Sequence, residues 1–421
     1  MSGNGKRGNI LVIGGGISGL TAAIEAAEAG ANVTIVEKEA FLGGRVARMN
    51  LYFPKMCPPS CGLEINLRRV KTNPRIRTLT LSTVESITGG PGRYKAAISK
   101  APRFVNSRCT ICGDCSEVCP VDRPDDINLG LSNTKAVYLP YEMAYPARFV
   151  IDSATCLGAD ACGKCVEACP YRAIDLSMPS EREEIEVDAV IWATGWYPPD
   201  ATHFEGLGFG TFPNVINNVT MERLSALNGP TGGKIQRPSD GKAPESVAFV
   251  QCAGSRDKNY YKHCSGVCCL ASLKQARYLR EQFPEARIYV FYIDIRAPGR
   301  LEDFFTATKE DERLTLIKGK VANITEVSAT GKLTVEAEDT LSGRRVAQEV
   351  DMVVLATGMI PNGIGDTRVE GGVELDEHGF LAVNQPQGYL AAGCAKRPTD
   401  VATCNRDATG VALKALHLSA E

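Results

Sequence analysis

The sequence of 421 residues contains no apolar run long enough to span a bilayer, and its formal charge is only -2. Basic and acidic residues nearly balance, so neither nucleic acid nor an anionic membrane surface is expected as a partner. The stretch Met1 to Gly8 is polar, and no signal peptide is expected there. Histidine is scarce, and the four histidines (His203, His263, His378 and His417) form no cluster. We therefore predict no catalytic acid or base.

Cysteine, by contrast, is abundant. Sixteen cysteines in a short secreted chain would indicate disulfides, but this chain is long enough for two or three domains. Together with the dinucleotide motif described next, they indicate metal ligands in an intracellular, oxygen-poor setting.

A glycine-rich turn opens the chain. The apolar run Ile10 to Ile13 leads into a G-x-G-x-x-G loop and an Ala-rich helical segment, and a second apolar run ends in Glu37. This order predicts a dinucleotide site, with the pyrophosphate at the helix N-terminus and the acid on a ribose hydroxyl. A glycine-rich turn of an unrelated α/β protein is the alternative. The residues predicted to bind here are Gly14, Gly16, Ile17, Ser18, Gly19, Glu37 and Lys38.

A second glycine pair, followed by an arginine, comes shortly after the ribose-binding acid. It resembles the Gly-Gly signature of flavoproteins with two dinucleotide-binding domains, as do two apolar strands that both end in Ala-Thr-Gly, at residues 193–195 and 356–358. These marks predict FAD as the cofactor. They add Gly43, Gly44, Arg45, Val84, Ala193, Thr194 and Gly195 to the predicted site.

Two runs of cysteines, each ending in proline, follow. The first, with the spacing C-x2-C-x2-C-x3-C-P, is the bacterial ferredoxin pattern, and the second departs from it only because five residues separate its first two cysteines. The ferredoxin arrangement exchanges the fourth cysteines between two [4Fe-4S] clusters. One cluster would use Cys109, Cys112, Cys115 and Cys169, and the other Cys119, Cys156, Cys162 and Cys165. Zinc is the alternative, although zinc sites usually use two separated cysteine pairs.

A second Rossmann-like unit begins with a strand at 246–251, but its turn lacks the glycine loop that binds NAD(P)H. Four cysteines stand there instead: Cys252, Cys264, Cys268 and Cys269. We predict a third [4Fe-4S] cluster on them; packing of small buried thiols is the alternative.

The last part of the chain approaches the flavin again. Flavoproteins of this class usually have Gly-Asp where this chain has Gly393 and Cys394, and Asp400 and Val401 precede a closing helix predicted to face the flavin. Cys404 is predicted to be packed there. Cys57 and Cys61 are either a dithiol facing the flavin or free thiols in a structural loop.

The expected fold class is α/β, a thioredoxin/glutathione reductase-like flavoprotein with two dinucleotide-binding domains and an inserted ferredoxin-like module for two [4Fe-4S] clusters. The predicted FAD-binding domain comprises residues 1–103, 181–242 and 351–421. The ferredoxin-like module is expected at 104–180 and the second Rossmann-like domain at 243–350.

These motifs together resemble the heterodisulfide reductase A subunit family over nearly the whole chain. The length is similar to that of the A subunit of the quinone-interacting membrane-bound oxidoreductase of sulfate reducers. That resemblance implies a cytoplasmic oxidoreductase that is peripherally attached to the inner membrane through two partners, a second HdrA-like flavoprotein subunit plus a membrane haem subunit. It implies electron transfer between menaquinone and adenylylsulfate reductase. The alternatives are a flavin-bifurcating heterodisulfide reductase component, an NAD(P)H-dependent flavin reductase, and a non-catalytic scaffold.

Overall fold

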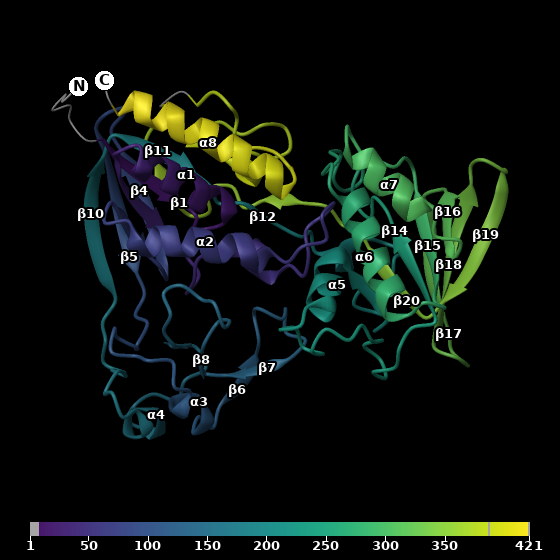
Figure 1. Ribbon diagram of the computed structural model, residues 1–421, viewed down its shortest axis with the longest axis horizontal. Coiled ribbons are helices and arrows are strands. Elements are labelled where there is room, and N and C mark those ends of the chain that lie inside the picture. Colours follow the sequence, from purple (N-terminus) through teal and green to yellow (C-terminus); the bar gives the residue numbers. More distant parts are fainter. Residues whose placement is uncertain (1–7, 386–387, 420–421) are drawn as a thin grey trace.

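The computed structural model describes residues 8–385 and 388–419. Residues 1–7, most of the polar stretch in which no signal peptide is expected, lie outside the described residues. The chain forms two sheet-and-helix domains side by side, with a small lobe beneath the first of them (Figure 1).

The first domain is built on a parallel five-stranded sheet. Its central strands, at residues 10–13 and 189–192, are buried on both faces, as parallel strands covered on both sides require. The strand order is β23-β11-β1-β2-β3, with bounds β1 Asn9–Ile13, β2 Asn32–Val36, β3 Ile76–Leu79, β11 Ala189–Trp192 and β23 Leu390–Ala391.

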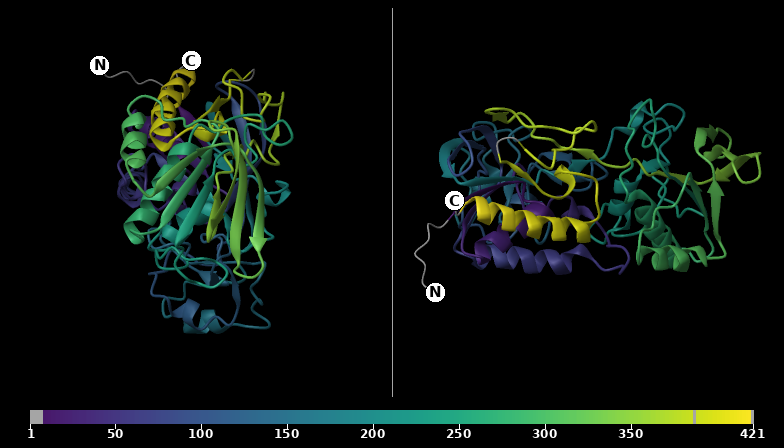
Figure 2. Two further views of the ribbon diagram at one scale, coloured as in Figure 1. Left: turned by 90° about the vertical axis from the view of Figure 1, so that its right-hand side faces the viewer. Right: turned by 90° about the horizontal axis from the view of Figure 1, so that it is seen from above.

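Helices cover one face of this sheet and a second sheet covers the other. The helices are α1 Ile17–Glu28, α2 Pro59–Thr72 and α8 Val401–Leu418, with short 3₁₀ turns at Gly44–Arg48 and Gly393–Ala395. The covering sheet consists of β4 Ser82–Thr88, β5 Tyr94–Lys100, β10 Glu181–Val187 and β22 Arg368–Val369. Figure 2 shows α8 running beside α1, which brings the last described segment back to the glycine-rich turn.

The second domain repeats this plan. Its parallel sheet, in the order β13-β20-β14-β15-β16, packs against helices on one face and a three-stranded antiparallel sheet on the other. The sheet strands are β13 Val215–Asn217, β14 Ser246–Val250, β15 Arg287–Tyr292, β16 Leu314–Lys318 and β20 Met352–Leu355. The covering elements are α5 Asn218–Ser225, α6 Cys268–Gln282, α7 Leu301–Lys309, β17 Val321–Val327, β18 Lys332–Asp339 and β19 Arg344–Val350.

Two parts of the predicted domain division are wrong. The sequence assigns residues 181–242 and 351–421 to the FAD domain, but β13 and β20 pair with each other, and β20 pairs with β14 in the second sheet. The chain crosses between the domains through the pair β12 Trp196–Tyr197 and β21 Ile360–Pro361, with a 3₁₀ turn at Ala201–His203. Both Ala-Thr-Gly strand ends look alike because the two sheets share one plan; strand pairing decides to which sheet each belongs.

The lobe leaves the first domain after β5 and returns at β10. It contains α3 Asp114–Glu117, α4 Lys164–Ala168, and two hairpins, β6 Asp122–Pro124 with β7 Asn133–Lys135 and β8 Val137–Tyr138 with β9 Val150–Ile151. Buried Arg223 of α5 holds the lobe against both domains, since its guanidinium donates to Asn128 Oδ1 at 3.0 Å and to the Arg48 carbonyl at 3.0 Å.

Candidate functional site

The glycine-rich turn joins β1 to α1 at very short range. A Cβ atom at Gly19 would lie 1.9 Å from the Gly14 carbonyl oxygen, so only glycine lets the helix approach the strand this closely. Gly14 has φ +107. The Cβ position of Gly16 is open, with the nearest atom 4.0 Å away. The N-terminus of α1 has no side-chain cap, so its amides are available for a phosphate.

The second glycine pair lies directly on this turn. Gly43 N donates to the Gly15 carbonyl at 2.8 Å, and a Cβ at Gly44 would lie 2.9 Å from the Gly16 Cα. Glu37, at the end of β2, is buried and accepts from the amides of Gly15 (2.6 Å) and Glu39 (2.9 Å). Burial raises the pKa of Glu37, and the two amide hydrogen bonds oppose this.

These residues line a large cleft with a cavity volume of about 1000 Å³. Ordinary ligand pockets measure ~300–1,000 Å³, so the cleft lies at the upper end of that range and suits a cofactor as long as a dinucleotide. The cleft runs from the glycine-rich turn to the facing helices of the second domain. Of the predicted cofactor residues, the cleft is lined by Gly14, Gly16, Ile17, Ser18, Glu37, Lys38, Gly44, Arg45, Val84, Ala193, Thr194, Gly195, Cys394, Asp400 and Val401.

Three predicted cofactor residues lie behind the lining instead. Gly19 and Gly43 serve close packing, and a Cβ at Gly393, which has φ +59, would lie 2.0 Å from Ser18 Oγ. Arg45 lies on the cleft wall with its guanidinium 4.7 Å from the Trp196 ring centre. Burial lowers the pKa of Arg45 to about 10.

Sequence reasoning missed the contribution of the second domain to this cleft. Lys274 and Gln275 of α6 and Glu222 of α5 line it. Lys274 Nζ lies 2.9 Å from Glu222 Oε1 and donates to the Leu51 carbonyl of the first domain at 2.7 Å. Both side chains are buried. A buried ion pair could have been suspected only from the pairing of the two helices, because the residues are far apart in sequence.

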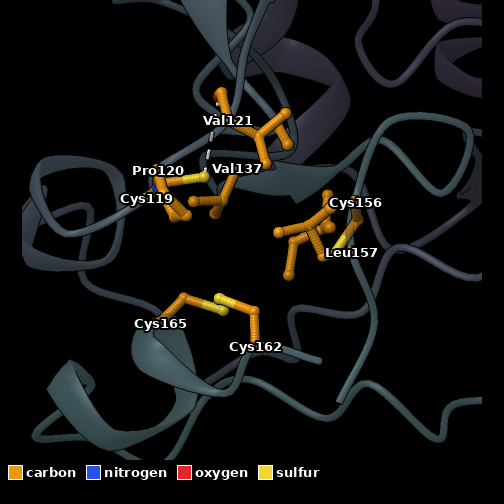
Figure 3. A pocket seen from close by; sticks show the side chains of 10 residues that line it. Cys119, Pro120, Val121, Val137, Cys156, Leu157, Cys162 and Cys165 are labelled. Atoms are coloured by element: carbon orange, nitrogen blue, oxygen red, sulfur yellow. Dashed lines mark hydrogen bonds between the residues drawn. The ribbon is translucent and has the colours of Figure 1, made fainter. Parts of the chain in front are cut away.

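The lobe contains two hollows, and each is lined by four cysteines. One is lined by Cys109, Cys112, Cys115 and Cys169, and the other by Cys119, Cys156, Cys162 and Cys165. Each hollow therefore combines three cysteines of one run with the fourth of the other, which is the exchange expected for two ferredoxin clusters. Figure 3 shows Cys119, Cys156 and the Cys162–Cys165 pair on different sides of the second hollow.

Electrostatics reflect the crowding of these thiols. Burial raises the pKa of Cys115 to about 12, and the neighbouring Cys109 and Cys112 add to this. Burial also raises the pKa of Cys165, and the charges of Cys156 and Cys119 raise it further. Crowded thiols of this kind become thiolates when cationic iron binds.

The spacing of these thiols bears on the choice of metal. In the part of the chain that the structure describes, no three His, Cys, Asp or Glu side chains converge as ligands of a single ion would. A zinc ion requires thiolates at ~2.3 Å from one centre. Four cysteines line each hollow without converging in this way.

Packing connects the lobe to the cleft. Leu139 packs both in the core that contains the lobe cysteines and in a cluster centred on Phe41, and Phe41 lines the cleft. Buried Arg103 adds polar contacts, donating to Thr80 Oγ1 at 3.0 Å and to the carbonyls of Arg148 and Phe149 across the lobe boundary.

The four cysteines of the second domain also gather. Cys252 follows β14 with φ +57, and Cys268 and Cys269 open α6. Burial raises the pKa of Cys269 to about 11, and Cys252 and Cys264 lie close enough to raise it further. Thiolates at a helix N-terminus are stabilised by the helix dipole. Cys268 packs in one cluster with Ile17 and Cys394 of the cleft lining.

Cys57 and Cys61 lie outside these groups. Both are exposed at the start of α2, and neither lines the cleft. Of the two interpretations left open by the sequence, the dithiol facing the flavin does not fit this placement. No helix among the described residues has the length and apolar character required to cross a membrane.

Comparisons with known proteins agree with this site. Residues 9–58 match the family described as FAD dependent oxidoreductase. Two thioredoxin reductase structures, from T. acidophilum and Lactococcus lactis, share the fold. The T. acidophilum structure has a TM-score of 0.53 and is 14% identical, covering 97% of both chains. The Lactococcus lactis structure also has a TM-score of 0.53 and is 12% identical, covering 98% of this chain and 99% of its own.

The curated relatives are more similar in sequence. The A subunit of the ferredoxin:CoB-CoM heterodisulfide reductase of Methanosarcina mazei is 38% identical over 97% of this chain and 53% of its own length. An iron-sulfur A subunit of the CoB–CoM heterodisulfide reductase of Methanopyrus kandleri is 38% identical over 96% of this chain and 63% of its own. The cleft, the glycine-rich turn and this similarity agree: the chain is an FAD-dependent oxidoreductase by its fold and motifs, it is similar to the heterodisulfide reductase A subunits over nearly all of its own length, and it spans a little over half the length of these relatives.

Proposed function

We propose that this chain is an electron-transfer flavoprotein subunit, with FAD in the cleft, two [4Fe-4S] clusters in the lobe and a third on the cysteines of the second domain. The observation that carries the proposal is the pair of hollows, each lined by four cysteines drawn from both runs. FAD, when bound, supplies the exchange between two-electron and one-electron chemistry.

The protein's own residues hold and insulate these groups. The amides of α1 and the Glu37 carboxylate would hold the pyrophosphate and ribose, and Arg45 and Lys274 place positive charge on the cleft wall. Lys274 is fixed by Glu222 and by the Leu51 carbonyl, so its charge is held at the junction of the two domains. The packing through Leu139 and Phe41 provides a continuous protein medium from the lobe to the cleft.

The first test counts iron and flavin in the anaerobically purified chain and in Cys268→Ala. Three clusters predict about twelve irons per FAD, falling to about eight in the variant, since each [4Fe-4S] cluster contains four. Cys61→Ser, which removes an exposed thiol outside all three groups, is the matched control and should retain about twelve. About eight irons per FAD in both wild type and Cys268→Ala would mean that the second-domain cysteines hold no cluster and are only packed thiols.

For partners, we propose a second HdrA-like flavoprotein subunit plus a membrane haem subunit, which would attach the chain peripherally to the inner membrane and link menaquinone to adenylylsulfate reductase. Support comes from the resemblance in motifs. Affinity purification from membranes of the native organism, followed by reduction of the flavin with a menaquinol analogue, tests this. Failure of the menaquinol analogue to reduce the intact complex would reject the quinone link.

The second candidate is a flavin-bifurcating heterodisulfide reductase component. It is favoured by the names of the relatives, which belong to CoB-CoM heterodisulfide reductases. Purification with a heterodisulfide-cleaving partner in place of the haem subunit would support it. An NAD(P)H-dependent reductase is less favoured because cysteines stand where the second glycine loop would be, and prompt flavin bleaching on mixing with NADPH would reverse that judgement.

A further inference from the structure

Two buried cysteines remain outside every proposed cluster. Cys394 Sγ and Cys404 Sγ lie 3.8 Å apart, and both side chains line the cleft. The cysteines come from different elements, the 3₁₀ turn after β23 and the first turns of α8. They therefore meet at the base of the cofactor cleft, beside the glycine-rich turn.

The surrounding contacts fix both elements. Asp400 caps α8 by accepting from Thr403 N at 3.0 Å. Asp407 of α8 accepts from Gly393 N at 2.8 Å and forms an ion pair with Lys396. The two thiols are thus held in contact by polar interactions on both sides, which random packing of small side chains does not require.

The pair is also chemically asymmetric. The contact with Cys394 lowers the pKa of Cys404, and a hydrogen bond with Ser18 adds to this against the opposing effect of burial. The same contact raises the pKa of Cys394. Two thiols in contact can form a disulfide, and the thiol with the lower pKa is the more reactive of the two because the thiolate is the nucleophile.

A metal site explains the pair less well. A stable site requires a third ligand, and no three metal-binding side chains converge within residues 8–385 and 388–419. Formation of a disulfide, by contrast, requires only that the sulfurs close from 3.8 Å to roughly 2.05 Å.

We propose that Cys394 and Cys404 form a redox-active dithiol of the flavin cleft. In its oxidation the two S–H bonds break and one S–S bond forms. The two electrons and two protons that leave pass to oxidised FAD, which becomes FADH2. The proposal rests on FAD binding in the cleft and on neither the cluster count nor the identity of the partners.

The test follows these two thiols directly. The anaerobic holoprotein is poised with mediators at a series of potentials, quenched in acid with N-ethylmaleimide, digested and analysed by mass spectrometry. We expect Cys394 and Cys404 to lose the label together, with a cross-linked peptide two hydrogens lighter. The ratio of dithiol to disulfide should change tenfold per ~30 mV, as a two-electron couple requires.

Two variants and a control sharpen the result. In Cys404→Ser, Cys394 should stay labelled at every potential, and dithionite titration should require two fewer electrons per chain than wild type. Cys394→Ser is the second variant. The labelling of its remaining thiol, Cys404, can be read even if the variant loses flavin. Cys61→Ser should titrate like wild type. Full labelling of both cysteines at all potentials in wild type would overturn the proposal, whatever the iron count shows.

Discussion

The two sheet-and-helix domains follow one plan, but their first turns carry opposite chemistry. In the first domain α1 begins at Ile17, directly after β1 ends at Ile13, and the glycine-rich turn leaves only backbone between them. In the second, residues 251–267 separate β14 from α6 and bring in four cysteines with the helix start. The same position at the carboxyl ends of parallel strands thus offers backbone amides suited to a phosphate in one case and thiols in the other.

The helices that follow these turns differ as well. The buried residues of α1 are all uncharged, whereas α6 buries Lys274 against Glu222. The first helix is specialised for close packing and phosphate binding. The second helix carries charge to the junction of the domains, where it contacts the Leu51 carbonyl.

The largest expected effect comes from breaking that junction. Lys274→Met leaves the buried Glu222 carboxylate unpaired, which should cost about 3–5 kcal/mol of the free energy of unfolding. The double variant Lys274→Met with Glu222→Gln should recover most of the loss, because no charge remains unpaired. Urea denaturation of the three proteins measures this, and equal stability of the single and double variants would contradict it.

The next effect tests the close approach in the first turn. Gly19→Ala places a methyl group against the Gly14 carbonyl, so it should destabilise the protein by about 1–3 kcal/mol and weaken FAD binding. Gly410→Ala is the matched control, since Gly410 also lies within a helix but its Cβ position has no neighbour within 4 Å. It should stabilise the protein by about 0.5–1 kcal/mol. Equal shifts in the two variants would show that the turn is looser than the structure indicates.

A smaller effect is expected at the ribose-binding acid. Glu37→Gln removes a charged acceptor, and FAD affinity measured by fluorescence titration should fall about tenfold, ~1.4 kcal/mol. Glu39→Gln, two residues further along on the cleft wall but only half-buried, should change the affinity less.

The same substitution should have the opposite effect on the protein without FAD. Because burial raises the pKa of Glu37, the ionised form is the one that destabilises the folded state. Folding is therefore favoured when this group is protonated, and that benefit is lost as the pH rises through its folded-state pKa. Apo Glu37→Gln should be more stable than apo wild type at neutral pH, with the difference shrinking in acid. A pH-independent difference in unfolding temperature would reject this account.

Much of the site could be predicted from the sequence because its motifs are local. The turn at Gly14 to Gly19 needs glycine for steric reasons within a few residues, and the cysteine spacing within each run reflects the size of a cluster. The proposed exchange of Cys119 and Cys169 between hollows could be expected only from the ferredoxin pattern, and the longer loop after Cys156 gave no indication of where that thiol would lie.

Other features could not be predicted in this way. Lys274 and Glu222 are separated by about fifty residues, and neither belongs to a motif. The contact of Cys394 with Cys404 depends on how α8 returns to the first sheet. The domain to which β20 belongs was mispredicted because its Ala-Thr-Gly end is the same as that of β11.

The sequence by itself determined which chemical groups each region offers: a glycine turn suited to a dinucleotide, runs of thiols spaced as in ferredoxins, and thiols in place of a second glycine loop. These depend on backbone sterics and ligand spacing over short distances. Only the tertiary structure decided which sheet holds each strand, that α5 and α6 complete the cleft, and that two cysteines meet at its base. Such contacts arise from strand pairing and helix packing, which bring together residues that no local pattern relates.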